Sequence, residues 1–266
     1  MAMSIYKKNP SSSSGDLVFR DDQAEYFALL DAAKERRPRG ARLKLIDTGR
    51  LSALELEGLG RAGFDLFTSD AARRDLSDFI RILAATKKGG GTVAYFHQGP
   101  LAEIPSASTL PLEAVRELAR RGALIYLSNK SAVRAADTLA VLAHEARRGG
   151  SRLVYYHHGA LLEGLEKAAR RGAWIHVLGD VAADLRNCPL LGDLAAAAAA
   201  ARAGLVVHLE RLIPAEILSD LHAAGAYLLF QTPPSDYRSP YRALEKKASR
   251  RTLDPKAGYL YSKFMR

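Results

Sequence analysis

The sequence has almost no cysteine and no long hydrophobic run. Cys188 is the only cysteine among 266 residues, which excludes an intramolecular disulfide and a zinc site made of several thiolates. No apolar stretch approaches the roughly 20 residues that a membrane-spanning helix needs. The serine-rich segment 1–20 also lacks the apolar core of a signal peptide, so we expect a disordered leader. These absences are typical of a cytoplasmic protein.

Diagnostic catalytic motifs are also missing. The segment Asp47-Thr48-Gly49-Arg50 is neither a dinucleotide-binding glycine pattern nor a phosphate-binding loop, and no nucleophile elbow or kinase signature occurs. The first expected strand lacks the His-x-His pair of many metal-dependent barrel hydrolases, and no His-Glu-x-x-His helix is present. The sequence therefore predicts no metal site and leaves any cofactor unknown.

The composition is that of an ordinary globular protein with an excess of positive charge. Hydrophobic residues make up 48% of the chain and charged residues 26%. The formal charge is +10 and the isoelectric point is near 9.7, which favours an anionic partner without identifying it. A chain of this length can form one large barrel or two smaller domains.

A short segment recurs along the chain and organises the rest. The stretch 153–159 matches 43–49 and 93–99 in its apolar body, polar tip and closing glycine, and 205–211 is a looser copy. Each copy is followed by a helix-period segment, a glycine and a second apolar run. Because Gly63, Gly122, Gly172 and Gly225 occupy the same place in the four units, the sequence indicates a fourfold strand–helix–strand–helix repeat.

The repeat predicts an α/β fold, a single (β/α)8 TIM-type barrel with an N-terminal extra helix and a basic C-terminal extension. An open doubly wound sheet is the alternative. We expect the leader at 1–20, the barrel at 21–232, and a basic helix and tail at 233–266. The expected strands are 43–47, 64–68, 92–97, 123–128, 153–159, 173–178, 205–209 and 226–231. The expected helices are 21–37, 52–61, 71–86, 112–121, 131–148, 161–171, a helical run at 195–201, and 214–224.

Strand residues of one parity are mostly aliphatic, whereas those of the other parity are polar or mixed. In a barrel the second set points to the axis, and the ends of the strands carry the active site. Unpaired buried polar groups cost about 1 to 3 kcal/mol each, so these side chains must bond one another, water or a ligand. The polar residues of this inward set include Lys44, Asp65, Gln98, Tyr156, His158, His176, His208, Glu210 and Gln231, with Thr48, Ser69, Tyr126 and Ser128 beside them.

Glu210 and His158 are the candidate catalytic pair. Both follow strand ends, where a carboxylate and an imidazole can share general acid and base work. Tyr156, His176 and His208 lie one layer deeper as binding or orienting groups. Gln98, Gln231, Lys44, Asp65, Arg50 and Arg211 are further binding candidates. The leading hypothesis is a hydrolase or lyase acting on a small anionic substrate; the alternative for these residues is a satisfied hydrogen-bond network.

Doubled arginines at expected helix ends suggest a different function. Arg120, Arg121, Arg170 and Arg171 belong to two copies of the sequence Ala-Arg-Arg-Gly-Ala. Barrel topology would gather such positions on the face opposite the active site. Compensation of the helix dipoles explains one or two cations per helix, but it does not require doubled arginines so often. The second hypothesis is therefore a non-catalytic scaffold that binds nucleic acid or an acidic protein through this face. The sequence does not indicate an oligomeric state.

Overall fold

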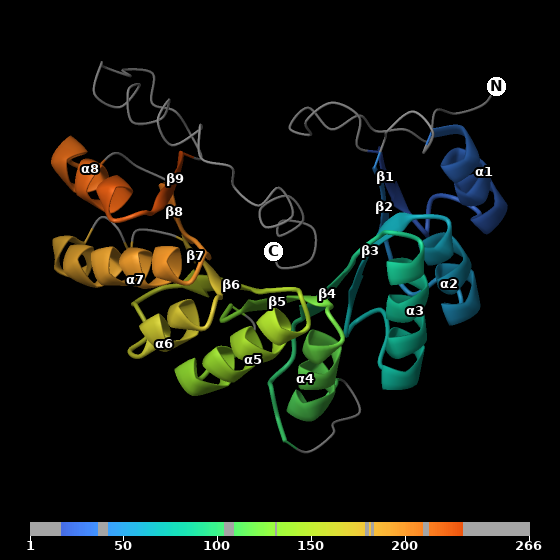
Figure 1. Cartoon of the computed structure of the whole chain (residues 1–266), viewed down its shortest axis with the longest axis horizontal. Helices are drawn as coiled ribbons and strands as arrows, with labels where there is room; N and C mark the ends of the chain where they lie inside the picture. The colour runs from blue at the N-terminus through green and yellow to red at the C-terminus, as the bar shows by residue number, and fades with distance from the viewer. Residues whose placement is uncertain are drawn as a thin grey trace. The chain divides into compact units, whose positions relative to one another are not determined.

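The computed structural model describes residues 17–36, 42–103, 109–130, 132–178, 181, 184–209 and 213–230. Helices alternate with parallel strands, and the strand order follows the chain from β1 to β9 (Figure 1). This is the strand order of the (β/α)8 class, as the sequence predicted, with one strand more than the expected eight. Closure into a barrel stays a prediction. The chain divides into two compact units, residues 1–125 and 126–266, which are described separately.

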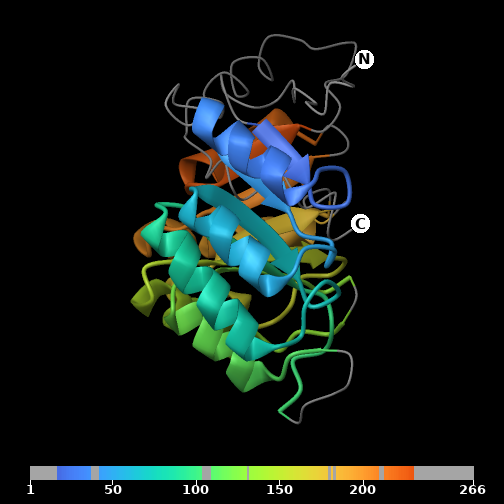
Figure 2. The same cartoon turned by 90° about the vertical axis from the view of Figure 1, so that its right-hand side faces the viewer.

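In the first unit, strands β1 to β4 form parallel neighbouring pairs. Helix α2 packs along α3, and both contact β3 (Figure 2). The elements are β1 (Leu17–Arg20), α1 (Tyr26–Arg36), β2 (Leu43–Ile46), α2 (Ala53–Arg61), β3 (Phe64–Ser69), α3 (Leu76–Lys88), β4 (Val93–His97) and α4 (Leu112–Arg120). Strand β5 (Leu124–Ser128) crosses the boundary between the units.

In the second unit, strands β6 to β9 are parallel neighbours, and α6 packs between α5 and α7. The elements are α5 (Ala136–Arg148), β6 (Leu153–His158), α6 (Leu165–Arg170), β7 (Trp174–Leu178), a 3₁₀ turn (Leu185–Asn187), α7 (Cys188–Ala200), β8 (Leu205–Leu209), α8 (Ala215–Ala223) and β9 (Tyr227–Phe230). None of the helices in the described residues is long and apolar enough to cross a membrane.

The repeated glycines mark the turns from helix to strand. Gly63, Gly122, Gly172 and Gly225 have φ angles of 95°, 88°, 98° and 107°. Any side chain at these positions would be strained, because L-residues rarely adopt this left-handed conformation. The turn is therefore encoded in the sequence at the same place each time.

Several expected boundaries were wrong. Strand β1 lies within the segment 1–20 that was expected to be a disordered leader, and it pairs with β2. Helix α3 begins at Leu76 rather than at 71. The chain first forms a turn in which two backbone amides donate to the Ser69 carbonyl, and Asp75 then caps the start of the helix. Helix α5 likewise begins at Ala136 instead of 131. Helix α7 begins at Cys188, seven residues before the helical run expected at 195–201.

The strand faces agree with the predicted parity. On the helix-facing side, Phe79 of α3 meets Tyr95 of β4 edge to face, with ring centroids 5.1 Å apart. On the opposite face of the second unit, the register aligns Tyr156 with His176 and His208 with Leu229. The polar positions identified in the sequence therefore share one face of their strands.

Candidate functional site

Two histidines and a tyrosine form a compact cluster on this face of the second unit. The His176 ring stacks on Tyr156, with centroids 4.3 Å apart. Its Nδ1 lies 2.9 Å from Nε2 of His208, a hydrogen-bond distance. Tyr126 stacks on the other side of the group, 6.5 Å from Tyr156. Strands β5 to β8 thus each contribute one ring to the cluster.

The cluster contains an unsatisfied polar atom. His176 is only 1% exposed, and its Nε2 has no hydrogen-bond partner among the residues that the structure describes. If His176 donates from Nδ1 to His208, then Nε2 carries a free lone pair; if His208 donates instead, Nε2 carries an unused proton. Either tautomer leaves one strong hydrogen-bonding group without a partner among the described residues. Such a buried group costs about 1 to 3 kcal/mol when nothing bonds it.

Burial keeps the two histidines neutral at physiological pH. It lowers the pKa of His176 well below its usual range, and the adjacent His208 lowers it further. Burial also lowers the pKa of His208 to about 4, with His158 adding a smaller electrostatic effect. A desolvated imidazole beside another imidazole favours the uncharged form. The pair is therefore suited to hydrogen bonding and not to holding a positive charge.

His158 lies at the end of β6, two residues beyond Tyr156. Its backbone amide donates to Oδ1 of Asn129 at 2.7 Å, and its carbonyl accepts from Nδ2 of the same residue at 2.8 Å. Asn129 follows β5 and therefore fixes the backbone position of His158. Burial first, and then Lys130 and His157, lower the pKa of the His158 imidazole. A neutral imidazole at this position can accept a proton at physiological pH.

The neighbouring His157 points to the other side of its strand, because successive strand residues alternate between the two faces. Its Nε2 donates to the Ala160 carbonyl at 2.7 Å, and its Nδ1 lies 3.2 Å from the Tyr155 hydroxyl. His97 repeats this pattern in the first unit with Tyr95 and the Pro100 carbonyl. Both histidines hold the loop that follows their strand, which is a structural role.

The interior candidates of the first unit are less available. Asp65 is 2% exposed and accepts from the Arg42 guanidinium and from the backbone amide and hydroxyl of Thr92. These contacts lie at the amino ends of β3 and β4, away from the strand ends where the sequence placed a site. Lys44 is buried beside Asp65 in the strand register. The Arg42 ion pair and the Thr92 hydrogen bonds satisfy the buried Asp65 carboxylate without a ligand.

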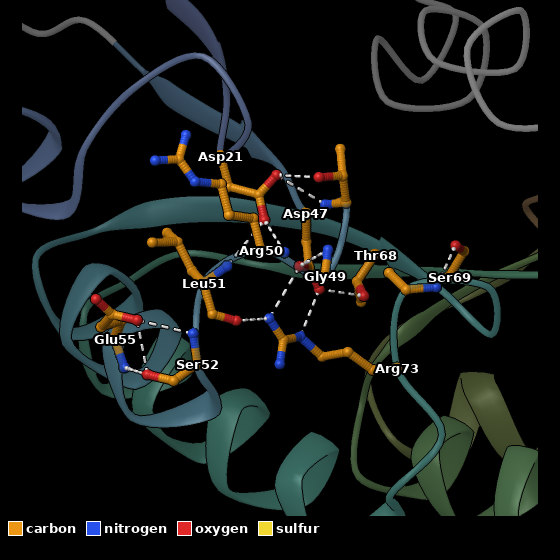
Figure 3. Close-up of polar contacts among 12 residues, drawn as sticks. Asp21, Asp47, Gly49, Arg50, Leu51, Ser52, Glu55, Thr68, Ser69 and Arg73 are labelled. Atoms are coloured by element: carbon orange, nitrogen blue, oxygen red, sulfur yellow. Dashed lines mark hydrogen bonds and ion pairs between the residues drawn. The ribbon is translucent and has the colours of Figure 1, made fainter.

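A carboxylate network ties together the loops after β1, β2 and β3 (Figure 3). Buried Asp21 accepts from the backbone amides of Thr48 and Arg50 and from the Thr48 hydroxyl at 2.6 Å. Asp47 is held by both Nε and Nη2 of Arg73, at 2.7 and 3.0 Å. The candidate Arg50 pairs instead with Glu25 at 2.5 Å. Arg50 is therefore part of the loop network.

Gln98 follows β4 in the same unit. Its backbone amide donates to Oδ2 of Asp70 at 3.0 Å, and the Gly99 amide donates to the same oxygen at 2.9 Å. The other carboxylate oxygen of Asp70 is buried with no partner among the described residues. Gln98 thus contributes its backbone to the loop anchor.

Three predicted site residues, Glu210, Arg211 and Gln231, lie outside the described residues. Of the set proposed from the sequence, the structure brings Tyr156, His176 and His208 together. The sequence analysis overlooked Asn129, Asp21 and buried Arg134, whose Nε donates to the Ser128 carbonyl. Asn129 and Asp21 each follow a strand directly, and that position was their only signal.

No group of three or more histidine, cysteine or carboxylate side chains within the described ranges is arranged to hold a metal ion. The His176–His208 pair supplies two imidazoles joined to each other. A zinc or manganese site needs further ligands, with their lone pairs directed at one point.

No protein-family model and no curated protein matches the chain. Among solved structures, a mandelate racemase/muconate lactonizing protein from Herpetosiphon aurantiacus aligns at 15% identity and TM-score 0.36, over 82% of this chain and 54% of that one. An HpcH/HpaI aldolase from Desulfitobacterium hafniense DCB-2 aligns at 11% and 0.36, over 74% and 88%. The 3-dehydroquinate dehydratase from Aquifex aeolicus VF5 aligns at 13% and 0.31, over 94% and 97%.

The chain spans about half the length of the racemase-like structure. Because these TM-scores are below 0.5, the likenesses carry no weight for function. The fold assignment depends on the chain's own strands and helices, and the candidate site on its own side chains.

Proposed function

We propose that the protein is an enzyme that binds a small anionic molecule at the histidine cluster of the second unit and uses His158 and Glu210 for general acid–base chemistry on it. The observation that carries the proposal is the buried Nε2 of His176, which has no partner among the described residues. In a purely structural core, a buried nitrogen without a hydrogen-bond partner lowers stability. An apolar residue could fill the same space without this cost. A ligand that bonds Nε2 removes this cost.

Within this proposal the residues have distinct roles. His158 acts as the general base, because its lowered pKa keeps the imidazole neutral and able to accept a proton. His176 binds the substrate, and its orientation is fixed by His208 and by stacking on Tyr156. Glu210, two residues beyond His208 in the sequence, is proposed as the general acid. Hydrolysis or a lyase-type elimination uses such an acid–base pair.

A panel of model reactions tests the proposal. Aryl phosphate and aryl ester hydrolysis would be followed by release of nitrophenol, and elimination from 3-hydroxy acids by ultraviolet absorbance of the alkene. We expect His158→Asn and Glu210→Gln each to lower kcat at least about 100-fold in the reaction that the wild type performs, because general acid–base groups contribute that much.

His222→Asn, on α8 outside the cluster, is the control and should retain activity. Far-ultraviolet circular dichroism would confirm that each variant folds. Activity that survives both His158→Asn and Glu210→Gln would refute the proposed roles, as would the absence of turnover by the wild type throughout the panel.

The scaffold hypothesis receives less support from the side-chain contacts. Arg120 and Arg121, two of its four arginines, pair with Glu113 and Glu117 on the same helix. Internal pairing reduces the charge available to nucleic acid phosphates. Arg170 and Arg171 differ, and they carry a separate inference.

A further inference from the structure

A basic pocket lies at the carboxyl ends of helices α5 and α6 in the second unit. Its volume is about 400 Å³, and its lining residues are all cationic or titratable to a cation: His144, Arg147, Arg148, Arg170 and Arg171. All five side chains are exposed to solvent. None of the four arginines forms an ion pair with a carboxylate of the described residues.

The internal repeat supplies a comparison for this pocket. The sequence Ala-Arg-Arg-Gly-Ala ends both α4 and α6. On α4, Glu117 bonds both arginines: Arg120 at 3.0 Å and Arg121 at 2.6 Å. Aligning the two motifs places Lys167 of α6 at the position of Glu117. The first motif is neutralised by its own helix, whereas the second has a cation where the neutralising carboxylate would be.

Lys167 does not compensate for the missing carboxylate. Its ammonium group pairs with Asp137 at 2.9 Å and therefore uses an acid from the neighbouring helix α5. The side chain of Arg147 lies close to the end of α6. Its Cδ would be only 3.4 Å from a Cβ atom added to Gly172, which follows that helix. The side chains of two helices thus converge on one hollow.

Compensation of helix dipoles accounts for only part of this charge. A cation in the last turn of a helix stabilises it by about 0.3 to 1 kcal/mol, and α5 and α6 each need one. The pocket has four arginines for two helix ends. Arg147 and Arg170 also line the neighbouring hollow between α6 and α7, together with Glu163, Glu166 and Asp193. Those carboxylates form no ion pair with the pocket arginines in the described part of the chain.

We propose that this pocket binds a compact polyanion of the phosphorylated-metabolite class, at a site separate from the histidine cluster. Guanidinium groups form paired, charge-assisted hydrogen bonds with phosphate oxygens, and several of them around one hollow suit a diphosphate group. A concave site of this volume favours a small molecule over an extended nucleic acid strand, which would follow a stripe of charge. This inference does not depend on the proposed catalytic activity.

Binding of inorganic pyrophosphate to the full chain, measured by isothermal titration calorimetry, tests the proposal. We expect Arg147→Ala/Arg170→Ala to weaken pyrophosphate binding by about tenfold or more, because each loses a charge-assisted hydrogen bond. Lys167→Glu should also weaken it, since this change restores the neutralising carboxylate of the first motif. The matched control is Arg120→Ala/Arg121→Ala, which alters the paired motif and should bind as the wild type does.

The proposal fails if the wild type does not bind pyrophosphate at millimolar concentration, or if the Arg147/Arg170 double variant binds it with unchanged affinity. An equal loss in the Arg120/Arg121 control would indicate general charge attraction and would also overturn it. A short single-stranded RNA serves as the competing probe. If the RNA binds at these arginines and pyrophosphate does not displace it, the surface is a nucleic acid site instead.

Discussion

The pKa of His208 makes a quantitative prediction about acid stability. The folded-state pKa is about 4, whereas an unfolded histidine titrates near 6.5. At pH 7 the folded imidazole is neutral and the unfolded one is mostly neutral, so His208 has only a small effect on the pH dependence there. As the pH falls below 6.5, the histidine binds a proton in the unfolded chain but not in the folded protein, and the free energy of unfolding decreases. For these two pKa values the loss is about 2 kcal/mol at pH 5 and about 3 kcal/mol at pH 4.

His208→Gln isolates this contribution. A glutamine amide can still bond Nδ1 of His176, but it does not titrate. Urea unfolding at pH 7, 6 and 5 should show that the wild type loses about 2 kcal/mol more than the variant over this range. The His208 C2 proton, followed by NMR, should have its titration midpoint far below 6.5. Equal pH dependence in the two proteins, or a midpoint near 6.5, would refute the reasoning.

Three other perturbations have expected outcomes in urea unfolding. Replacing Arg73 by Met removes the ion-pair partner of the buried Asp47 carboxylate and should lower the free energy of unfolding by about 3 to 5 kcal/mol. Arg50→Met breaks an exposed ion pair and should lower it by at most about 1 kcal/mol, so similar losses in the two variants would contradict this reasoning. Asn129→Ala should cost about 1 to 3 kcal/mol, since it removes both anchors of the His158 backbone, and no change would exclude that role. Ser52→Ala removes one half of the α2 capping box and should cost about 1 kcal/mol, which a value near zero would dispute.

The sequence predicts the fold better than it predicts the site. Repeated glycines and the period-2 polarity of strands are local signals, and the positive φ of Gly63 and the shared face of Tyr156 and His176 confirm both. Strand β1 had no such signal. Four residues are too few to show a period-2 pattern, and the pairing of β1 with β2 is a tertiary contact.

Side-chain partners could not be predicted because they depend on register and distance. Asp65 and His176 have the same parity, yet Arg42 and Thr92 satisfy Asp65 while His176 retains an unbonded nitrogen. The two Ala-Arg-Arg-Gly-Ala motifs also look alike in sequence. Only the contacts show that Glu117 neutralises one of them. Burial and pairing, and not residue type, separate a structural group from an available one.

Nitrogen-15 NMR of the histidine side chains tests the proposed site most directly. Nitrogen shifts report the tautomer of each ring and whether Nε2 of His176 is bonded. On addition of the anionic substrate identified in the panel of model reactions, the Nε2 resonance of His176 should shift to that of a hydrogen-bonded nitrogen, with a smaller change at His158. If both resonances stay unchanged at saturating ligand, the cluster is a structural core and the proposed function is wrong.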